Sequence, residues 1–333
     1  MGGKALKNTY TRRYNSYEYN ELSDEVIDSI QHYWSWSEVI PAYFSKRDFG
    51  DMDVLVANSA YNNRRIEIIS TLFSPNEIVK NGNVVSFDYK EFQIDLIFVD
   101  ISYYYFAFGY FAYNDLGNFI GRTAHRLGFK FGHDGLWYSL RDPDCENYLV
   151  KEILVTDDFD NALTFLGFDP AIHRDGFNCP TDIFEYAASS QYFDPAQFLL
   201  HNRSCEARKR DRTRKMYTEM LQWILAKYPT LDPNADPVAA DKHFHLERAF
   251  SIFPKFKSEY DLEFANLQLL KKFKKNFNGE NYAEWFGLEG KELGALMKKH
   301  RAYVEKYNLK EWIGTLDKEQ YRMVASAINN SGE

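Results

Sequence analysis

Two aspartates stand one residue apart at the start of an apolar run, in Gly50-Asp51-Met52-Asp53-Val54-Leu55-Val56. Side chains alternate between the two faces of a strand, so Asp51 and Asp53 are predicted to lie on one face with their Cα atoms about 7 Å apart. The glycine before them permits a tight turn and the close approach of a phosphate. This pattern favours a fold in which a buried strand begins at a polar site.

A third acid, Asp95, lies inside a second apolar run, Phe92-Gln93-Ile94-Asp95-Leu96-Ile97-Phe98. A carboxylate among buried apolar neighbours costs free energy unless a cation or a hydrogen-bond donor receives it. Carboxylate oxygens are the ligands that hard divalent cations prefer. We therefore expect Asp51, Asp53 and Asp95 to hold two Mg²⁺ or Mn²⁺ ions. The alternative is that the first two acids cap a turn and that Asp95 lies at a sheet edge.

Composition limits the classes of protein to which the chain can belong. Its 333 residues suffice for one large domain or two. The 40 Lys and Arg against 48 Asp and Glu give a formal net charge of −8, which argues against a protein that coats nucleic acid non-specifically through bulk positive charge. The three cysteines show no CxxC spacing and no apolar signal segment opens the chain, so we expect a cytoplasmic protein. The polar residues within the most apolar stretch, 96–113, predict no membrane span.

Hydrophobic periodicity predicts an α+β fold. An amphipathic helix is expected over residues 17–41, and a small mixed sheet should follow, with strands at 54–56, 84–87 and 92–99 and a helix at 61–73. Asn81-Gly82-Asn83 predicts a hairpin turn, and Gly128 should end a helix over 115–130. Beyond Pro180 the pattern is helical. Helices are expected there over 183–187, 206–228, 260–277, 281–286, 289–307 and 317–329.

The acid pattern resembles the nucleotidyltransferase superfamily, and most specifically the palm and thumb of X-family (beta-like) DNA polymerases. Gly50-Asp51-Met52-Asp53-Val54-Leu55 matches the first two catalytic aspartates of that family, and Ile94-Asp95 matches the third. Tyr110-Phe111-Ala112-Tyr113-Asn114 resembles the segment that lies against the sugar of the incoming nucleotide. The likeness continues through the segment 156–168, which is similar to the closing thumb helix, and covers residues 41–175.

The resemblance implies a domain order and roles for individual residues. It implies an N-terminal helical segment (1–40), a palm that forms the catalytic core (41–114), a thumb-like subdomain (115–178) and an all-α C-terminal domain (179–333). Asp51, Asp53 and Asp95 would be the catalytic residues and the metal ligands. The nucleotide and its phosphates would contact Gly50, Ser45, Lys46, Arg47, Tyr110, Asn118 and Arg122, the last of these along the template strand.

The sequence departs from the family at several positions that affect the choice of substrate. Phe44-Ser45-Lys46-Arg47 lies closer to the first aspartate than the family's phosphate-binding Gly-Ser turn does. Ala112-Tyr113-Asn114 replaces Thr-Gly-Ser, so sugar selectivity cannot be carried over. Only about 40 residues precede the palm, so the family's N-terminal lyase domain is not expected.

Features of the second half of the chain point to a nucleic-acid partner. A basic run from Arg203 to Lys215 predicts a local positive track, and Lys271, Lys272, Lys274 and Lys275 form a second cluster. In the first run the residues expected to bind nucleic acid are Arg208, Lys209, Arg210, Arg212, Arg214 and Lys215. The segment 277–297 resembles the helical tail of CCA-adding enzymes and bacterial poly(A) polymerases. Its alternative explanation is that Gly287, Gly290 and Gly294 let helices pack closely.

These observations predict a metal-dependent nucleotidyltransferase that adds nucleotides to a nucleic-acid 3′ end and releases pyrophosphate from a nucleoside triphosphate. One alternative is an untemplated enzyme that extends tRNA or RNA 3′ ends, of the CCA or poly(A) type. A further alternative is transfer of a nucleotide to a protein or a small molecule. The last alternative is an interaction protein that has kept the fold without catalysis, which the intact acid trio disfavours. DNA against RNA, base preference and oligomeric state stay open.

Overall fold

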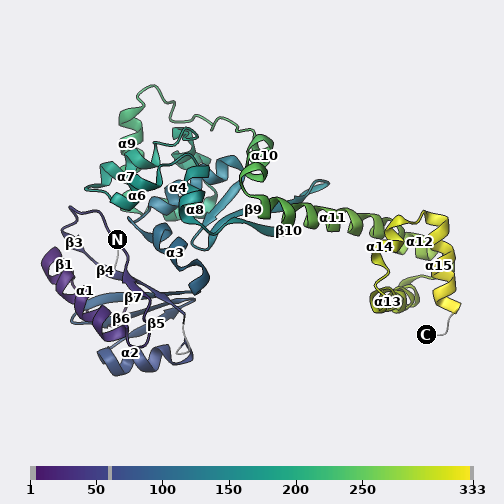
Figure 1. Ribbon diagram of the computed structural model, residues 1–333, viewed down its shortest axis with the longest axis horizontal. Coiled ribbons are helices and arrows are strands. Elements are labelled where there is room, and N and C mark those ends of the chain that lie inside the picture. Colours follow the sequence, from purple (N-terminus) through teal and green to yellow (C-terminus); the bar gives the residue numbers. More distant parts are fainter. Residues whose placement is uncertain (1–4, 59–61, 331–333) are drawn as a thin grey trace. The chain divides into compact units, whose positions relative to one another are not determined.

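The computed structural model describes residues 5–58 and 62–330, except for the side chains of residues 146 and 147. The chain divides into two compact units (Figure 1). The first unit is Met1–Tyr138 with Leu154–Phe253, and the second is Ser139–Ile153 with Pro254–Glu333. The chain passes between the units within strands β9 (Gly135–Asp142) and β10 (Cys145–Thr156). The boundaries expected at residues 40, 114 and 178 all lie inside the first unit.

A five-stranded mixed sheet forms the centre of the first unit, in the order β2-β4-β7-β6-β5. The strands β4 and β7 run parallel, and the other neighbours are antiparallel. Gly82, in the left-handed region at φ 59°, closes the hairpin between β5 and β6, as its sequence predicts. The strands are β2 (Ser37–Val39), β4 (Asp51–Ala57), β5 (Ile78–Asn81), β6 (Val84–Tyr89) and β7 (Phe92–Val99).

The two faces of this sheet bury different sets of residues. Met52, Val54 and Val56 of β4 pack in a core with α1 (Ser16–Ile30) and α2 (Arg65–Phe73), which cover one face. Leu55 and Ala57 pack on the other face against α3 (Tyr104–Phe111). Asp51 and Asp53 belong to this second face by alternation, at the end of the strand that α3 does not bury.

The helix expected over residues 17–41 ends at Ile30, so that expectation is wrong for residues 31–41. The chain turns after α1, where the Ser37 hydroxyl donates to the Trp34 carbonyl at 2.6 Å. Ser37–Val39 then pairs antiparallel with β4, with Ser37 opposite Val56. The apolar pattern continues through Trp34 because this side chain is buried beside the edge strand β2, where it is only 1% exposed.

Strands β9 and β10, within which the chain passes between the units, form a three-stranded sheet with β8 in the order β10-β9-β8, and β1 and β3 form a separate pair. The expected helix 206–228 is broken between α8 and α9, and Gly128 ends α4 in a left-handed cap as predicted. The remaining elements are β1 (Tyr14–Asn15), β3 (Asp48–Phe49), α4 (Leu116–Leu127), β8 (Phe129–Gly132), α5 (Phe159–Phe165), α6 (Pro170–Asp175), α7 (Pro180–Ala187), α8 (Cys205–Asp211), α9 (Lys215–Lys227) and α10 (Lys242–Ile252), with 3₁₀ turns at Asn62–Arg64, Ile101–Tyr103, Pro195–Phe198 and Leu200–Asn202.

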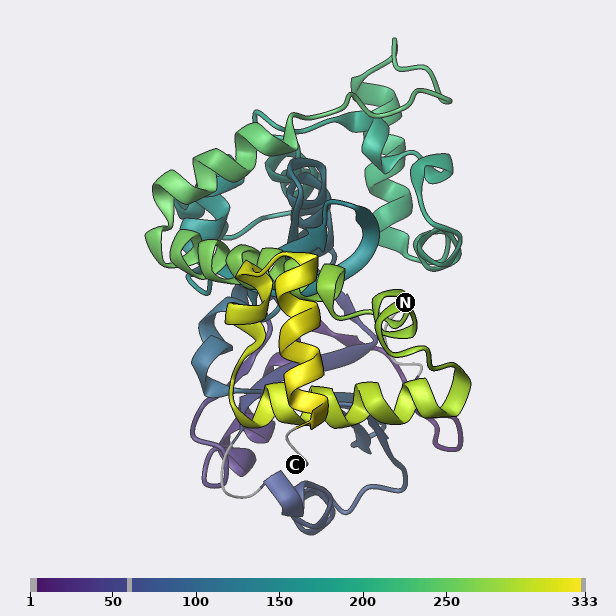
Figure 2. The same ribbon diagram turned by 90° about the vertical axis from the view of Figure 1, so that its right-hand side faces the viewer.

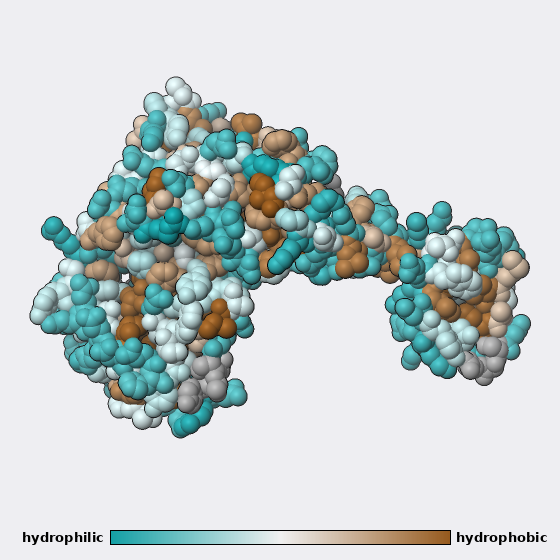
Figure 3. All heavy atoms as spheres, viewed as in Figure 1, coloured by the Kyte–Doolittle hydropathy of each residue, from teal (hydrophilic) through white to brown (hydrophobic). Residues whose placement is uncertain are grey.

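The second unit consists mainly of helices, and Figure 2 shows α15 crossing α13 within it. They are α11 (Pro254–Asn276), α12 (Gly279–Phe286), α13 (Gly290–Lys306), α14 (Lys310–Thr315) and α15 (Lys318–Asn330). Their core contains Phe273, Phe277, Tyr282, Val304, Ile313, Tyr321 and Ala325. The face seen in Figure 3 is largely hydrophilic over both units. Within the described part of the chain no helix is long and apolar enough to cross a membrane.

A mixed sheet with helices and a helical C-terminal region confirm the α+β class. The assignment of residues 41–114 to a nucleotidyltransferase palm stays a prediction.

Candidate functional site

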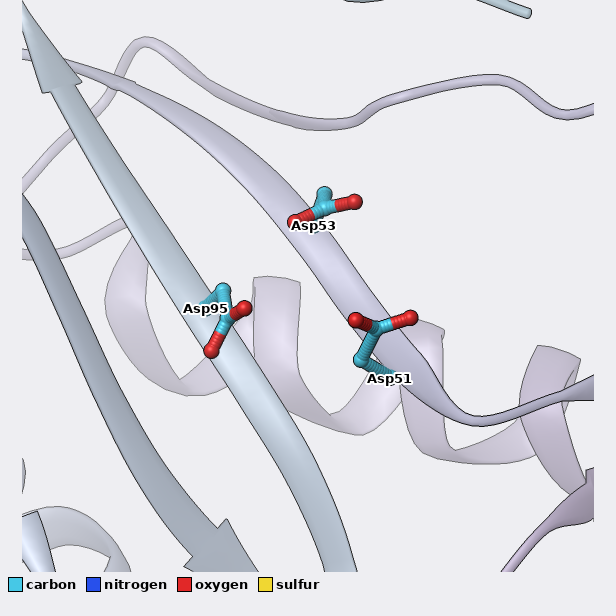
Figure 4. A group of neighbouring side chains, drawn as sticks. All are labelled: Asp51, Asp53 and Asp95. Atoms are coloured by element: carbon cyan, nitrogen blue, oxygen red, sulfur yellow. The ribbon is translucent and has the colours of Figure 1, made fainter. Parts of the chain in front are cut away.

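Three carboxylates meet on one face of the central sheet. Asp53 on β4 is the direct register partner of Asp95 on β7, and Asp51 lies two residues before Asp53. The three side chains project to the same side of the two strands (Figure 4). One oxygen from each lies within 4.8 Å of the others. The structure therefore brings together the acids that the sequence singles out, and the alternative that Asp95 lies at a sheet edge is wrong, because β7 has neighbours on both sides.

Polar neighbours on β6 and β7 hold the third acid. The Gln93 side-chain amide donates to both Asp95 oxygens, at 3.0 and 3.1 Å, and is itself only 2% exposed. The side-chain oxygen Oε1 of Gln93 accepts a hydrogen bond from the backbone N–H of Ala5 at 3.0 Å, and this bond fixes the orientation of the side-chain amide. Ser86, opposite Asp95 on β6, adds a hydrogen bond to that carboxylate. The role of Gln93 was not predicted from the sequence, although a polar residue two positions before a buried acid is a signal for it.

Burial and the repulsion between neighbouring carboxylates raise the pKa values of Asp53 and Asp95. Burial, followed by the charges of Asp51 and Asp95, raises the pKa of Asp53 to about 7. Burial is also the main cause that raises the pKa of Asp95 to about 6, against the hydrogen bonds from Ser86 and Gln93. Three close oxygen donors that repel one another when ionised fit Mg²⁺ or Mn²⁺, because a divalent cation removes the repulsion. The site is thus chemically suited to hold a metal ion.

A cleft of about 660 Å³ in the first unit includes two of the acids and a set of basic side chains. Asp51 and Asp53 line it together with Gly50. The basic residues that line it are Arg13, Lys46, Arg47, Arg214 and Lys215. A volume of this size accommodates a small-molecule ligand. Three of these basic residues pair with carboxylates that also line the cleft, Arg13 with Asp48, Arg214 with Asp115 and Lys215 with Glu219. Lys46 and Arg47, close to Asp51 in the sequence, are therefore the cations best suited to an anionic ligand that carries its own divalent cations.

Two of the three residues expected to bind phosphates line the cleft. Lys46 is half-buried, and its ammonium lies 4.6 Å from the centre of the Phe49 ring. Burial lowers the pKa of Lys46, whereas the charges of Asp51 and Asp53 raise it. Arg47 is exposed beside it. Ser45 is also exposed, but it is not among the residues that line the cleft, and its backbone N–H donates to the Asn178 carbonyl at 2.8 Å.

Tyr110 and Asn118, which were expected at the nucleotide, also line the cleft. The Asn118 amide donates to the Asp115 carboxylate at 3.2 Å. Between them the chain bends through Tyr113 and Asn114, which have φ values of 58° and 65°. A left-handed backbone at two successive non-glycine residues is uncommon in proteins. Where it does occur, it is often at a functional site. Here it bends the chain between α3 and α4.

Arg122 lies elsewhere, and its expected role at the nucleotide or template is corrected. It is 7% exposed and does not line the cleft. Its guanidinium donates to the Asp211 carboxylate at 3.0 Å and to the Gln197 carbonyl at 2.9 Å, and it lies over the rings of Phe198 and Tyr217. Arg122 is therefore a buried structural cation, because both terminal nitrogens of its guanidinium already donate to protein groups.

The basic run around α8 is used in part by the fold. Arg203 and Arg210 donate to Asp211, Arg208 donates to the Arg203 carbonyl at 3.0 Å, and Arg214 is paired with Asp115. Lys209, Arg212 and Lys215 are exposed. Of the six residues expected to bind nucleic acid, the structure places only Arg214 and Lys215 at the cleft.

The structure of residues 277–297 does not support the alternative explanation that their glycines let helices pack closely. A Cβ added at Gly287, Gly290 or Gly294 would meet no described atom within 4 Å. Close packing of helices therefore does not require these glycines, and that alternative is wrong. Gly287 and Gly290 serve turns instead, with φ values of 64° and 55°. In the second basic cluster, Lys271 is bound by Asp142 and Asp144.

Some residues at the cleft carry no local sequence signal. Arg13 is brought there by the short β1-β3 pair, in which Tyr14 lies opposite Phe49. Tyr19 of α1 stacks on Phe49 with ring centres 3.8 Å apart. Contacts between residues this far apart in the chain depend on the tertiary fold.

No family model matches this chain, and no curated protein matches it significantly. The fold and the site define a mixed α+β protein with a three-carboxylate cluster suited to a metal ion.

Proposed function

We propose that this protein is a metal-dependent nucleotidyltransferase that adds nucleotides to the 3′-hydroxyl of a nucleic acid. The observation that carries the proposal is the pairing of Asp53 with Asp95 on adjacent parallel strands, with Asp51 on the same face. Two divalent cations held there would lower the pKa of the attacking hydroxyl and neutralise charge on the triphosphate and the leaving pyrophosphate. This chemistry agrees with the family resemblance of the acid motif.

The chain's own residues have separate tasks in this proposal. The three aspartates position the reacting oxygens by holding the cations. Lys46 and Arg47 bind the triphosphate from the loop before the first acid, and Tyr110 contacts the sugar. Lys215 and Arg214, at the start of α9, bind the phosphate backbone of the acceptor strand.

Besides templated synthesis, two other reactions are compatible with the acid cluster. The resemblance of residues 277–297 to the tail of CCA-adding enzymes favours untemplated extension of a tRNA or RNA. Transfer to a protein or a small molecule would need no basic contacts to an acceptor strand, and the cationic residues beside the acids disfavour it.

The test is incorporation of labelled nucleotides. Purified protein with Mg²⁺ or Mn²⁺ is given each dNTP and NTP with a primer–template, a single-stranded DNA or a tRNA that lacks its 3′ end. Extension of the primer–template with the complementary dNTP would make it a polymerase, and extension of tRNA or single strand would make it a tailing enzyme. Asp53→Asn should abolish either activity, while Asp236→Asn, at an exposed position outside the cleft, should leave it unchanged. Lack of extension of all three acceptors would overturn the proposal.

A further inference from the structure

A second cavity of about 660 Å³ lies in the first unit, apart from the carboxylate cluster. Of the residues that line it, only Pro41 also lines the first cleft. Helix α3 contributes to both: Tyr110 and Phe111 line the cleft, and Tyr105, Phe106 and Gly109 line the second cavity. The far wall comes from the start of α5 and from α6.

One buried nitrogen in the wall of this cavity has no hydrogen-bond partner in the described structure. His173 is 6% exposed, and its Nε2 is the unpaired atom. The imidazole hydrogen-bonds to the backbone of Gly109. The Gly109 carbonyl is free to accept, because the N–H of Tyr113, its partner in a continued helix, donates to the Pro41 carbonyl at 2.8 Å instead.

The protonation of His173 follows from these contacts. A ring nitrogen that meets a carbonyl must carry the proton, so in the neutral imidazole the remaining nitrogen, Nε2, is an acceptor. Burial, the largest effect, lowers the pKa of His173 to about 4, so the ring is neutral near pH 7. His173 therefore brings to the wall of the cavity one buried lone pair that an N–H or O–H donor of a ligand can satisfy.

The charge and the rings of the wall specify the kind of donor. Asp157, Asp158 and Asp160 line the cavity with a single guanidinium, Arg174, and that guanidinium is paired with Asp160. Asp157 and Asp158 are exposed, and Asp158 also accepts from the backbone of Asn161 at 2.7 Å. The excess of carboxylates repels phosphates and attracts cations. Aromatic side chains in the wall, Tyr105, Phe106, Tyr113 and Phe159, suit an apolar body and stabilise a cation over a ring.

We propose that this cavity binds a small organic cation, an ammonium or guanidinium group on an apolar body, which donates to His173 Nε2 and pairs with Asp157. The volume lies within the range of small-molecule sites. The proposal is independent of the nucleotidyltransferase assignment, because it uses none of the three metal-binding acids.

The experiment compares matched probes by calorimetry or ligand-detected NMR at pH 7.5 and low salt. Benzylamine should bind at least about tenfold more tightly than benzyl alcohol, which has the same apolar body without the charge. AMP should not compete with benzylamine. Equal binding of amine and alcohol, displacement of the amine by AMP, or no binding of the amine would each overturn the proposal.

Variants locate the bound probe. Asp157→Asn should weaken benzylamine binding by about threefold, because it removes one charge from an exposed position, and Asp236→Asn should leave it unchanged. His173→Phe keeps a ring in the wall and should weaken binding by about tenfold or more. Thermal unfolding shows whether His173→Phe is folded, and Asp157→Asn decides the question if it is not. Benzylamine affinity that is the same in Asp157→Asn and the native protein would place the probe elsewhere and contradict the assignment.

Discussion

Asp53 and Asp95 face each other across two parallel strands as direct register partners. The apolar residues that alternate with them, Met52 and Val54 on β4 and Ile94 and Leu96 on β7, are fully buried on the opposite face. A slip of one residue in either strand would turn an acid into this core, so burial fixes the register of the site. The geometry of the candidate metal site is therefore a consequence of the hydrophobic pattern around it.

The first prediction concerns stability without metal. The pKa of Asp53 is raised to about 7 in the folded protein, against 3.8 for an ordinary aspartate. Between pH 4 and 7 the folded state binds more protons than the unfolded state, so this group's contribution to stability is present at low pH and is lost as the pH rises to 7.

Chemical unfolding in a chelator should show this loss. From pH 5 to pH 8 the native protein should lose at least about 1 kcal/mol relative to Asp53→Asn, which cannot ionise there. At pH 8, saturating Mg²⁺ should stabilise the native protein more than Asp53→Asn, because it binds the three native acids and not the altered set. Parallel stability curves for the two proteins with and without Mg²⁺ would contradict the prediction.

The second prediction concerns the buried pair Arg122–Asp211, whose side chains are 6% and 3% exposed. Asp211→Asn leaves the Arg122 guanidinium buried without its counter-charge and should lower the free energy of unfolding by about 3–5 kcal/mol. The matched control is Asp261→Asn in the exposed pair Lys257–Asp261, which should cost less than about 1 kcal/mol. Urea unfolding measures both. Equal small losses would show that Arg122 reaches solvent or another partner.

How far the sequence predicts the site depends on how local each signal is. An acid inside an apolar run is visible in a few residues, so Asp51, Asp53 and Asp95 could be found and placed on one face. The partner of Arg122 lies 89 residues away, and no local pattern distinguishes an arginine that awaits a phosphate from one that is paired in the core. The same limit hid Arg13, which reaches the cleft only because β1 pairs with β3.

Secondary structure followed the same rule. The turn at Gly82 and the helix end at Gly128 were predicted, because positive φ at a glycine is a local requirement. The end of α1 was not predicted, because the apolar pattern continues after Ile30. The helix ends there because Ser37 pairs with Val56 in the sheet, and this contact is not visible in the local sequence. Tertiary pairing overrode periodicity there.

The third prediction concerns acceptor binding at the start of α9. Lys215→Gln should weaken binding of a nucleic-acid acceptor about equally across sequences, and should reduce the dependence of log affinity on log salt by about one unit. Lys80→Gln, at an exposed position of β5 outside the cleft, is the matched control and should change neither quantity. Fluorescence anisotropy with a labelled strand over a salt series measures both. An unaltered salt slope in Lys215→Gln would remove α9 from the proposed acceptor track.

The fourth prediction concerns a buried hydrogen-bonded chain in the second unit. Tyr282 bonds His300 Nδ1 at 2.9 Å and the Tyr321 hydroxyl at 2.8 Å, and His300 is fully buried. Burial lowers the pKa of His300 to about 4, so its contribution to stability is present above pH 6.5 and is lost as the pH falls toward 4.

Thermal unfolding at pH 7 and pH 4.5 tests this contribution. His300→Gln, which keeps a polar side chain but does not titrate, should lose less stability on acidification than the native protein. His243→Gln, at an exposed histidine, should behave like the native protein. If His300→Gln and the native protein lose the same stability between pH 7 and pH 4.5, protonation of another group causes the loss, and the prediction is wrong.

Asp51, Asp53 and Asp95 should form one cation site, and Mn²⁺ binding tests this most directly. Titration of Mn²⁺ into the protein, followed by electron paramagnetic resonance of the free ion, should show binding to the native chain that Mg²⁺ displaces. The same titration of Asp51→Asn and Asp53→Asn should show its loss, with Asp236→Asn unchanged and all four proteins folded. Native binding that persists in both cluster variants, or no Mn²⁺ binding by the native protein, would contradict the central claim.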